Sequence, residues 1–265
     1  MQPPSLSPWA AQLWLAVTLL TTTGGALGAD SKPVDPRLLD RFEARVFKEP
    51  TGASLNYRLF KPAPFQPGTN YPLVLFLHGA AGLGEDNERQ FNGGNEVPPL
   101  ALSTEEAQRR FPHFVMAPQC PRNQSWSAYT GNPSGPLRLT MRAIEELQRE
   151  FPIDRRRLYV VGVSMGGRGV WDALLHYPTS FAAAVPICAA GEPEGINKIK
   201  DVPIWCFHGG ADTTVSVEYA RRSVNALRKA GGHPKYTEYP GVGHDSYRKA
   251  FQEPDLLPWL FAQHR

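Results

Sequence analysis

A serine between two glycines, in Gly162-Val163-Ser164-Met165-Gly166, is the strongest chemical signal in the sequence. The pentapeptide follows the apolar segment 158–161 and precedes a helical pattern over 168–176, which is the strand, turn and helix setting of a nucleophile elbow. Flanking glycines permit a tight turn that lifts the serine hydroxyl off the edge of a sheet. Ser164 is therefore the candidate nucleophile, and an incidental serine in a glycine-rich turn is the alternative.

A serine hydroxyl needs a base to take its proton, and a histidine is the expected base. His244 stands in the glycine-rich loop 240–245, directly after the strand-like segment 236–239. Open α/β sheets place their sites in loops at the carboxyl ends of strands. We expect His244 to be the base. His208, at the end of another apolar segment, is the competing histidine and is interpreted as a structural residue.

A carboxylate must orient the base, and the chain order typical of this fold is serine, acid, histidine. Asp212 fits this order and follows a strand-like segment. Asp201 precedes its strand, at the wrong end of the sheet, and Asp245 is adjacent to the proposed base. Asp212 is therefore the candidate acid, with a residue that only shapes an Asx-type turn as the alternative.

Fixed N–H donors must stabilise the oxyanion that forms when the serine attacks a carbonyl carbon. One donor is expected from Met165, the residue after the nucleophile. The second is expected from the loop after the apolar segment 73–77, with the Ala80 amide as first choice and Ala81 as the reserve. His78 in the same loop is expected to brace it.

Two tryptophans have different expected places. Trp126 lies in the polar stretch 122–126 after a predicted strand, on the side that should face the site. Aromatic side chains often line acyl or sugar pockets, so Trp126 is a candidate substrate-binding residue, and packing over the domain edge is the alternative. Trp171, at helical spacing behind the nucleophile, is expected in the core.

The elements that must position these residues alternate along the chain. Apolar strand-like runs separated by helical patterns indicate parallel strands buried on both faces. Two strands around the turn 50–52 predict a leading antiparallel hairpin. The sequence therefore predicts one doubly wound α/β domain over residues 37–265. The predicted strands are 42–48, 55–60, 73–77, 114–117, 158–163, 182–187, 204–207 and 236–239, and the helical patterns are 137–151, 168–176 and 217–230.

Composition removes other classes of protein. The chain has 265 residues, 42% of them hydrophobic, so a disordered, collagenous or coiled-coil protein is excluded. The net charge is only +3, and the densest basic run, 155–157, is expected in a solvated turn, so no nucleic-acid partner is expected. The 3 cysteines allow at most one bridge, and their spacing fits no metal site. Cys188 and Cys206 are expected to be small buried hydrophobic residues.

The N-terminal segment has the pattern of an export signal. Residues 1–29 carry no Lys, Arg, Asp or Glu, segment 9–20 is almost wholly apolar, and small residues flank Leu27. We expect a signal peptide over 1–28 and a secreted or periplasmic protein without stable membrane association after cleavage. An uncleaved N-terminal anchor stays open, because a basic n-region is missing.

The chain resembles the secreted α/β-hydrolase esterases of the phospholipase/carboxylesterase and dienelactone-hydrolase-like group, close to feruloyl-esterase-like and polyhydroxybutyrate-depolymerase-like proteins. The resemblance rests on the stretches 77–82, 85–87, 117–121, 162–167, 185–188, 208–212 and 239–245. It implies an α/β-hydrolase fold, a Ser164, Asp212 and His244 triad, and a serine hydrolase of carboxylic esters that uses no cofactor or metal. The substrate implied is a small-molecule or polymer-attached ester.

The interval between Cys188 and Pro203 is short, which leaves little room for an inserted lid. The sequence therefore predicts an open site and a carboxylesterase for short-chain or aryl esters. A feruloyl or acetylxylan esterase and a prolyl-oligopeptidase-like peptidase are the enzymatic alternatives, although the chain has no room for the gating propeller of such a peptidase. A non-catalytic binding module is the remaining class, and the complete triad argues against it.

Overall fold

The computed structural model describes residues 34–128 and 131–265. The expected signal peptide over 1–28 lies outside the described residues. Helix α2 (Pro36–Arg41) begins one residue before the predicted domain boundary at 37, and Leu38 within it is fully buried. Among the described residues, no helix combines the length and the apolar character needed to cross a bilayer.

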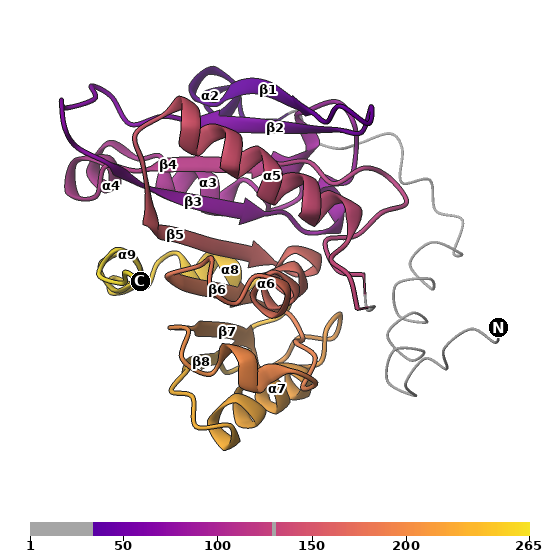
Figure 1. The fold of residues 1–265 in the computed structure, drawn as a ribbon. Helices are drawn as coiled ribbons and strands as arrows, with labels where there is room; N and C mark the ends of the chain where they lie inside the picture. The colour runs from indigo at the N-terminus through magenta and orange to yellow at the C-terminus, as the bar shows by residue number, and fades with distance from the viewer. Residues whose placement is uncertain (1–33, 129–130) are drawn as a thin grey trace.

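Eight strands form one sheet in the order β1-β2-β4-β3-β5-β6-β7-β8 (Figure 1). β1 and β2 form an antiparallel hairpin, β2 is antiparallel to β4, and every other neighbouring pair is parallel. This arrangement confirms the predicted α/β sheet with a leading hairpin. The bounds are β1 (Glu43–Lys48), β2 (Ser54–Phe60), β3 (Tyr71–Leu77), β4 (Phe114–Pro118), β5 (Ile153–Val163), β6 (Ala183–Ile187), β7 (Trp205–Gly209) and β8 (Lys235–Tyr239).

Helices cover both faces of this sheet (Figure 1). One face packs against the buried residues of α5 (Gly135–Glu150), α6 (Met165–His176) and α7 (Val217–Lys229). The opposite face packs against α2, α3 (Val97–Leu102), α8 (Tyr247–Ala250) and α9 (Leu256–Phe261). The central strands β3, β4, β6 and β7 are buried on both sides, because a separate cluster of buried side chains covers each face of the sheet.

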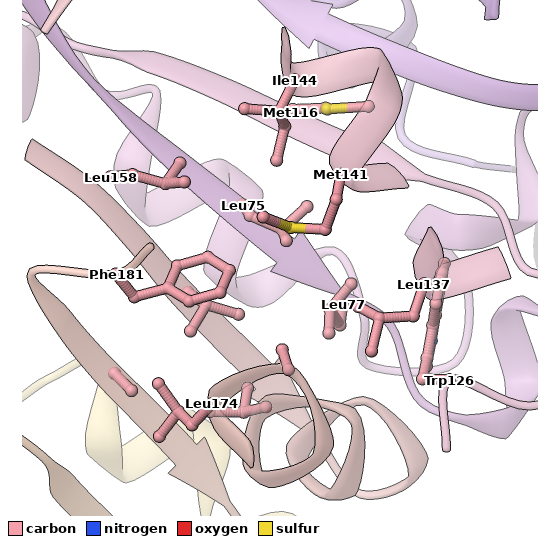
Figure 2. Packing of buried hydrophobic residues seen from close by; sticks show 14 of the residues in the cluster. Leu75, Leu77, Met116, Trp126, Leu137, Met141, Ile144, Leu158, Leu174 and Phe181 are labelled. Carbon is pink, nitrogen blue, oxygen red and sulfur yellow. The ribbon is translucent and has the colours of Figure 1, made fainter. Parts of the chain in front are cut away.

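Helix α5 shows how the sequence selects its element and its buried face. Ser134 caps the helix, since its hydroxyl accepts a hydrogen bond from the Leu137 amide at 3.3 Å. Leu137, Met141 and Ile144 then recur at helical spacing and pack onto Leu75 and other residues of β3 and its neighbours (Figure 2). Burying each such side chain contributes roughly 1.5–3 kcal/mol. The sheet and α5 are therefore held together along this apolar face.

Strand β5 begins earlier than the sequence indicated. It starts at Ile153, so Arg155, Arg156 and Arg157 lie within the strand and the expectation of a solvated turn is wrong. Arg155 and Arg156 are nevertheless exposed, which explains why the apolar pattern becomes visible only from Leu158. Three consecutive arginines show no alternation of apolar and polar residues, so the sequence does not indicate a strand at this point.

Sheet order brings two loops together at one edge. β3 lies between β4 and β5, and its last residue, Leu77, pairs with Gly162 near the end of β5. The chain after β3 and the chain after β5 therefore leave the sheet side by side. From β3 the chain continues to β4 on one side of it and then crosses to β5 on its other side. Open α/β sheets form their sites where the strand order reverses in this way.

Candidate active site

Ser164 occupies a strained turn between β5 and α6. Its backbone has φ 56° and ψ −115°, a region that a residue with a side chain rarely adopts. The turn is held by the Ser164 amide, which donates to the Ile187 carbonyl at the end of β6 at 2.9 Å. The turn is also tight, because a Cβ atom on Gly162 would overlap the carbonyl oxygen of Gly166. The flanking glycines are thus required by close backbone approach.

Ser164, His244 and Asp212 form a chain of hydrogen bonds. His244 Nε2 lies 2.9 Å from Ser164 Oγ, and His244 Nδ1 lies 2.7 Å from Asp212 Oδ2. A carboxylate only accepts, so Nδ1 carries the hydrogen and Nε2 is free to accept the serine proton. Ser164 and His244 are half-buried, which leaves the reacting atoms in reach of a substrate. The structure thus brings together the three residues expected from the sequence.

The Asp212 carboxylate is buried but well supplied with donors. Oδ1 accepts the amides of Thr214 and Val215, each at 2.9 Å, and Oδ2 accepts His244. Burial alone raises the pKa of Asp212, but hydrogen bonds from His208, His244 and Val215 outweigh burial and hold this pKa well below its usual range. Asp212 is therefore ionised at neutral pH, as the acid of a triad must be.

The loop after β3 forms a short 3-10 turn, η1 (Ala80–Gly82), next to the nucleophile. A Cβ atom on Gly79 would lie 3.5 Å from Ser164 Cβ, so the turn begins beside the serine. The first N–H groups of a helical turn have no partner within it, which applies to Ala80 here and to Met165 at the start of α6. Both amides thus begin helical turns next to Ser164, and their role as oxyanion donors stays a prediction.

The η1 turn is fixed by three side chains, those of His78, Asn95 and Trp126. His78 Nδ1 donates to the Gly79 carbonyl at 2.7 Å, and His78 Nε2 accepts the Cys120 amide at 2.9 Å. The Gly79 amide donates to Asn95 Oδ1 at 2.7 Å. Full burial lowers the pKa of His78 to about 4, so the ring is neutral and keeps one donor and one acceptor nitrogen. His78 braces the turn, as expected, whereas no local signal in the sequence points to Asn95.

Trp126 is the third brace, and its expected role as a substrate-binding residue is wrong. Its side chain has no exposed surface, and its indole Nε1 donates to the His78 carbonyl at 3.0 Å. The ring lies edge-on to His78 and beside Leu137 in the core (Figure 2). A ring without accessible surface cannot line a pocket. Trp171 is 1% exposed, which confirms its expected place in the core.

His208 contacts the acid and not the nucleophile turn. It is fully buried, and its Nε2 lies 2.9 Å from the Val215 carbonyl and 3.3 Å from Asp212 Oδ2. The sequence had suggested a structural histidine here, and its proximity to the acid could not be read from spacing alone. Cys120, Cys188 and Cys206 are free and buried, as expected for Cys188 and Cys206.

The connection between β6 and β7 is short and carries no long inserted segment. Residues 188–204 contain only the short turn η3 (Ile196–Ile199), which packs against α6 and α7. Two surface cavities, of about 690 and about 540 Å³, are lined by none of the triad residues. Within residues 34–128 and 131–265, no group of three or more His, Cys, Asp or Glu side chains could hold a metal ion.

Comparisons with known proteins agree with this geometry. Residues 135–254, which include all three triad residues, match the dienelactone hydrolase family. A probable carboxylesterase of Oryza sativa subsp. japonica is 25% identical over 198 residues, covering 66% of this chain and 81% of that relative. A bifunctional acetylxylan esterase/xylanase of Neocallimastix patriciarum is 27% identical over 174 residues, covering 65% of this chain and 23% of the relative.

A solved structure shows the same fold at higher identity. The crystal structure of a thermostable esterase superposes with a TM-score of 0.81 at 39% identity, covering 86% of this chain. The match spans 64% of that esterase's own length. Together with the eight-stranded sheet and the matched segment 135–254, these similarities support an α/β-hydrolase-fold esterase of the dienelactone hydrolase group.

Proposed function

We propose that the chain is a serine carboxylesterase that hydrolyses short-chain or aryl carboxylic esters through an acyl-enzyme on Ser164. The observation that carries the proposal is the continuous hydrogen-bonded path from Ser164 Oγ through the His244 ring to Asp212, with distances of 2.9 and 2.7 Å. The names of the carboxylesterase and esterase relatives support the same class of reaction.

In the acylation step, Ser164 Oγ attacks the ester carbonyl carbon while His244 Nε2 takes the serine proton. The carbonyl oxygen becomes an oxyanion, and the amides of Ala80 and Met165 stabilise it. Collapse of this intermediate breaks the bond to the alcohol, and the proton on His244 passes to the leaving alkoxide oxygen. Asp212 stabilises the imidazolium that exists in between.

In the deacylation step, water takes the place of the alcohol. His244 Nε2 accepts a proton from the water as its oxygen attacks the acyl carbon, and the same two amides hold the second oxyanion. Collapse returns the proton to Ser164 Oγ and releases the carboxylic acid. Each acylation and deacylation cycle therefore consumes one ester and one water.

The short β6–β7 connection, which leaves little room for a lid, favours short acyl groups. A long acyl chain gains about 0.8 kcal/mol for each methylene that it buries, and this gain needs an apolar tunnel or lid. The β6–β7 connection supplies only η3. We expect kcat/KM for p-nitrophenyl esters to be greatest between acetyl and butyryl and to decline by octanoyl. A steady rise through dodecanoyl would contradict the open site.

A polymer-linked ester is the second candidate substrate. The acetylxylan esterase/xylanase relative favours acetylated xylan, and the open site is compatible with an acetyl group on a chain. Release of acetate from acetylated xylan and of ferulate from methyl ferulate would be compared with p-nitrophenyl acetate. A kcat/KM for xylan acetyl groups above that for p-nitrophenyl acetate would make the polysaccharide the preferred substrate.

The catalytic proposal is tested by Ser164→Ala and Asp212→Asn. Ser164→Ala should lower kcat by several orders of magnitude without unfolding the protein, since only the amides of the oxyanion site then contribute. Asp212→Asn should lower kcat by roughly 10⁴, because the ring of His244 loses its required tautomer. Near-normal hydrolysis by the Ser164 variant would refute the proposal.

A further inference from the structure

His208 is a buried titratable residue for which the reaction steps above have no role. It is the fourth residue of β7, and none of its side chain is exposed. Its Nε2 lies 3.3 Å from Asp212 Oδ2, the same oxygen that accepts His244 Nδ1 at 2.7 Å. Two histidines, His208 and His244, thus contact the same oxygen of the Asp212 carboxylate.

The contacts of His208 decide which nitrogen carries the hydrogen. Nε2 faces two oxygens that only accept, the Val215 carbonyl at 2.9 Å and the Asp212 carboxylate, so Nε2 is the donor. His208 Nδ1 is buried and has no hydrogen-bond partner among the described residues. The hydrogen that reaches Asp212 is therefore the one on Nε2.

We propose that His208 is a positioning residue of the ester hydrolysis, holding Asp212 Oδ2 toward His244 and sharing the negative charge of that oxygen. The inference rests on the proposed serine esterase function. His208 touches neither the substrate nor the reacting atoms in this account. It acts through Asp212, because its Nε2 lies 3.3 Å from the oxygen that accepts His244, while the amides of Thr214 and Val215 hold the other oxygen.

The sharing of charge has a consequence for the pH profile. A carboxylate that gives less of its charge to His208 stabilises the imidazolium form of His244 more strongly. Without the His208 donor, the protonated and inactive base therefore persists to higher pH. The acidic limb of the kcat/KM profile should move to higher pH when the donor is removed.

Two other titratable groups near this trio are paired or uncharged in the described structure. Glu238 on β8 pairs in register with His208, but it accepts two hydrogen bonds from Arg221 of α7 and one from Tyr236. Burial raises the pKa of the Cys188 thiol, after β6, far above its ordinary value, so this thiol is uncharged. Asp245, which follows His244 in the chain, is exposed and is the same in all the variants compared below.

The test compares His208→Leu with His208→Gln, because the glutamine amide nitrogen reaches as far from the backbone as His208 Nε2 and keeps the donor. With p-nitrophenyl acetate, His208→Leu should lower kcat roughly tenfold or more, the equivalent of one hydrogen bond to a charged group, with KM within about twofold. Its acidic limb should shift upward by roughly half a pH unit, a fraction of the effect of a full neighbouring charge. His208→Gln should restore the limb and most of kcat.

His113→Leu is the matched control, because His113 is equally buried and bonds to Phe111 and Gln108 away from the triad. It should lower stability without moving the limb. If His208→Leu does not fold, His208→Asn replaces it, since asparagine is one bond too short to reach Asp212. If the acidic limb of the kcat/KM profile does not shift in the donor-free variant, or if glutamine does not restore it, the inference is wrong. Esterase activity of the wild type and its loss in Ser164→Ala would still support the proposed function.

Discussion

A Cβ atom on Gly166 would overlap the carbonyl oxygen of Leu77. Gly166 is in the first turn of α6, and Leu77 is the last residue of β3. The helix that follows the nucleophile therefore packs directly on the strand that precedes η1. Backbone lies against backbone here, with no side chain between them. This close approach fixes the end of β3, just before the turn that carries Ala80, against α6.

Gly166→Ala should lower both stability and activity. The added methyl group must displace β3 or α6, and overpacking of this kind typically costs about 1–3 kcal/mol in the free energy of unfolding. The measurement is denaturant unfolding together with kcat for a short-chain ester. Gly131→Ala is the matched control, because a Cβ atom on Gly131 meets nothing within 4 Å. A Gly166 variant as stable and active as wild type would contradict the close approach.

Ala80→Pro should remove one oxyanion donor and little else. Proline lacks only the N–H, is well tolerated at the first helical position, and accepts the extended ψ of 177° at Gly79. We expect kcat to fall about 10²-fold to 10³-fold with KM nearly unchanged, as for other oxyanion donors. Ala80→Val keeps the N–H, adds bulk and should retain activity. Full activity in the proline variant would show that Ala80 is not the donor and would favour the amide of Ala81.

Acid should destabilise the fold through its buried histidines. Burial lowers the pKa of His78 and of His113 to about 4 each. An unfolded histidine binds a proton near pH 6.5, so between pH 6.5 and 4 the unfolded state takes up protons that the folded state does not. Stability is complete above pH 6.5 and falls as the pH drops toward 4, by about 1.4 kcal/mol per unit of pKa difference for each group.

The check is the free energy of unfolding between pH 7.5 and 4.5 for wild type and His113→Gln. The variant has one fewer buried titrating ring, so its stability should depend less steeply on pH in this window. Equal slopes for the two proteins would show that folding does not lower the pKa of His113.

Trp126→Phe should impair the oxyanion turn without changing acyl preference. Phenylalanine fills most of the buried space but lacks the Nε1–H that donates to the His78 carbonyl. We expect kcat to fall for all esters by a similar factor, with an unchanged ratio of kcat/KM for methyl ferulate to that for p-nitrophenyl acetate. A selective loss on the aromatic ester would place the indole against the substrate after all.

The strands and the order of the triad could be predicted from sequence because their signals are local. Buried strands such as β3 are continuous apolar runs, and Ser164 and Asp212 each follow such a run. His244 follows β8, a more polar strand in which the two tyrosines, Tyr236 and Tyr239, mark the segment. The loops at the carboxyl ends of parallel strands then meet at one edge. Helix α2 and the start of β5 were missed, since a proline-led turn of helix and three consecutive arginines carry no apolar periodicity.

The packing of the site residues could not be predicted in the same way. Trp126 stands among polar neighbours and looked exposed, yet it is buried by a contact with His78, which lies 48 positions away in the sequence. Asn95 reaches the Gly79 amide across 16 positions with no motif to announce it. The approach of His208 to Asp212 depends on how the loop after β7 folds back, which only the structure provides.

The central claim is that Ser164 is the activated nucleophile, and mass spectrometry after treatment with a fluorophosphonate tests it most directly. Wild type should gain the mass of one phosphonyl group, peptide mapping should place this group on Ser164, and esterase activity should be lost in proportion. His244→Ala should label far more slowly, because the serine then lacks its base. An active enzyme that stays unlabelled, or that carries the label on another residue, would contradict the account.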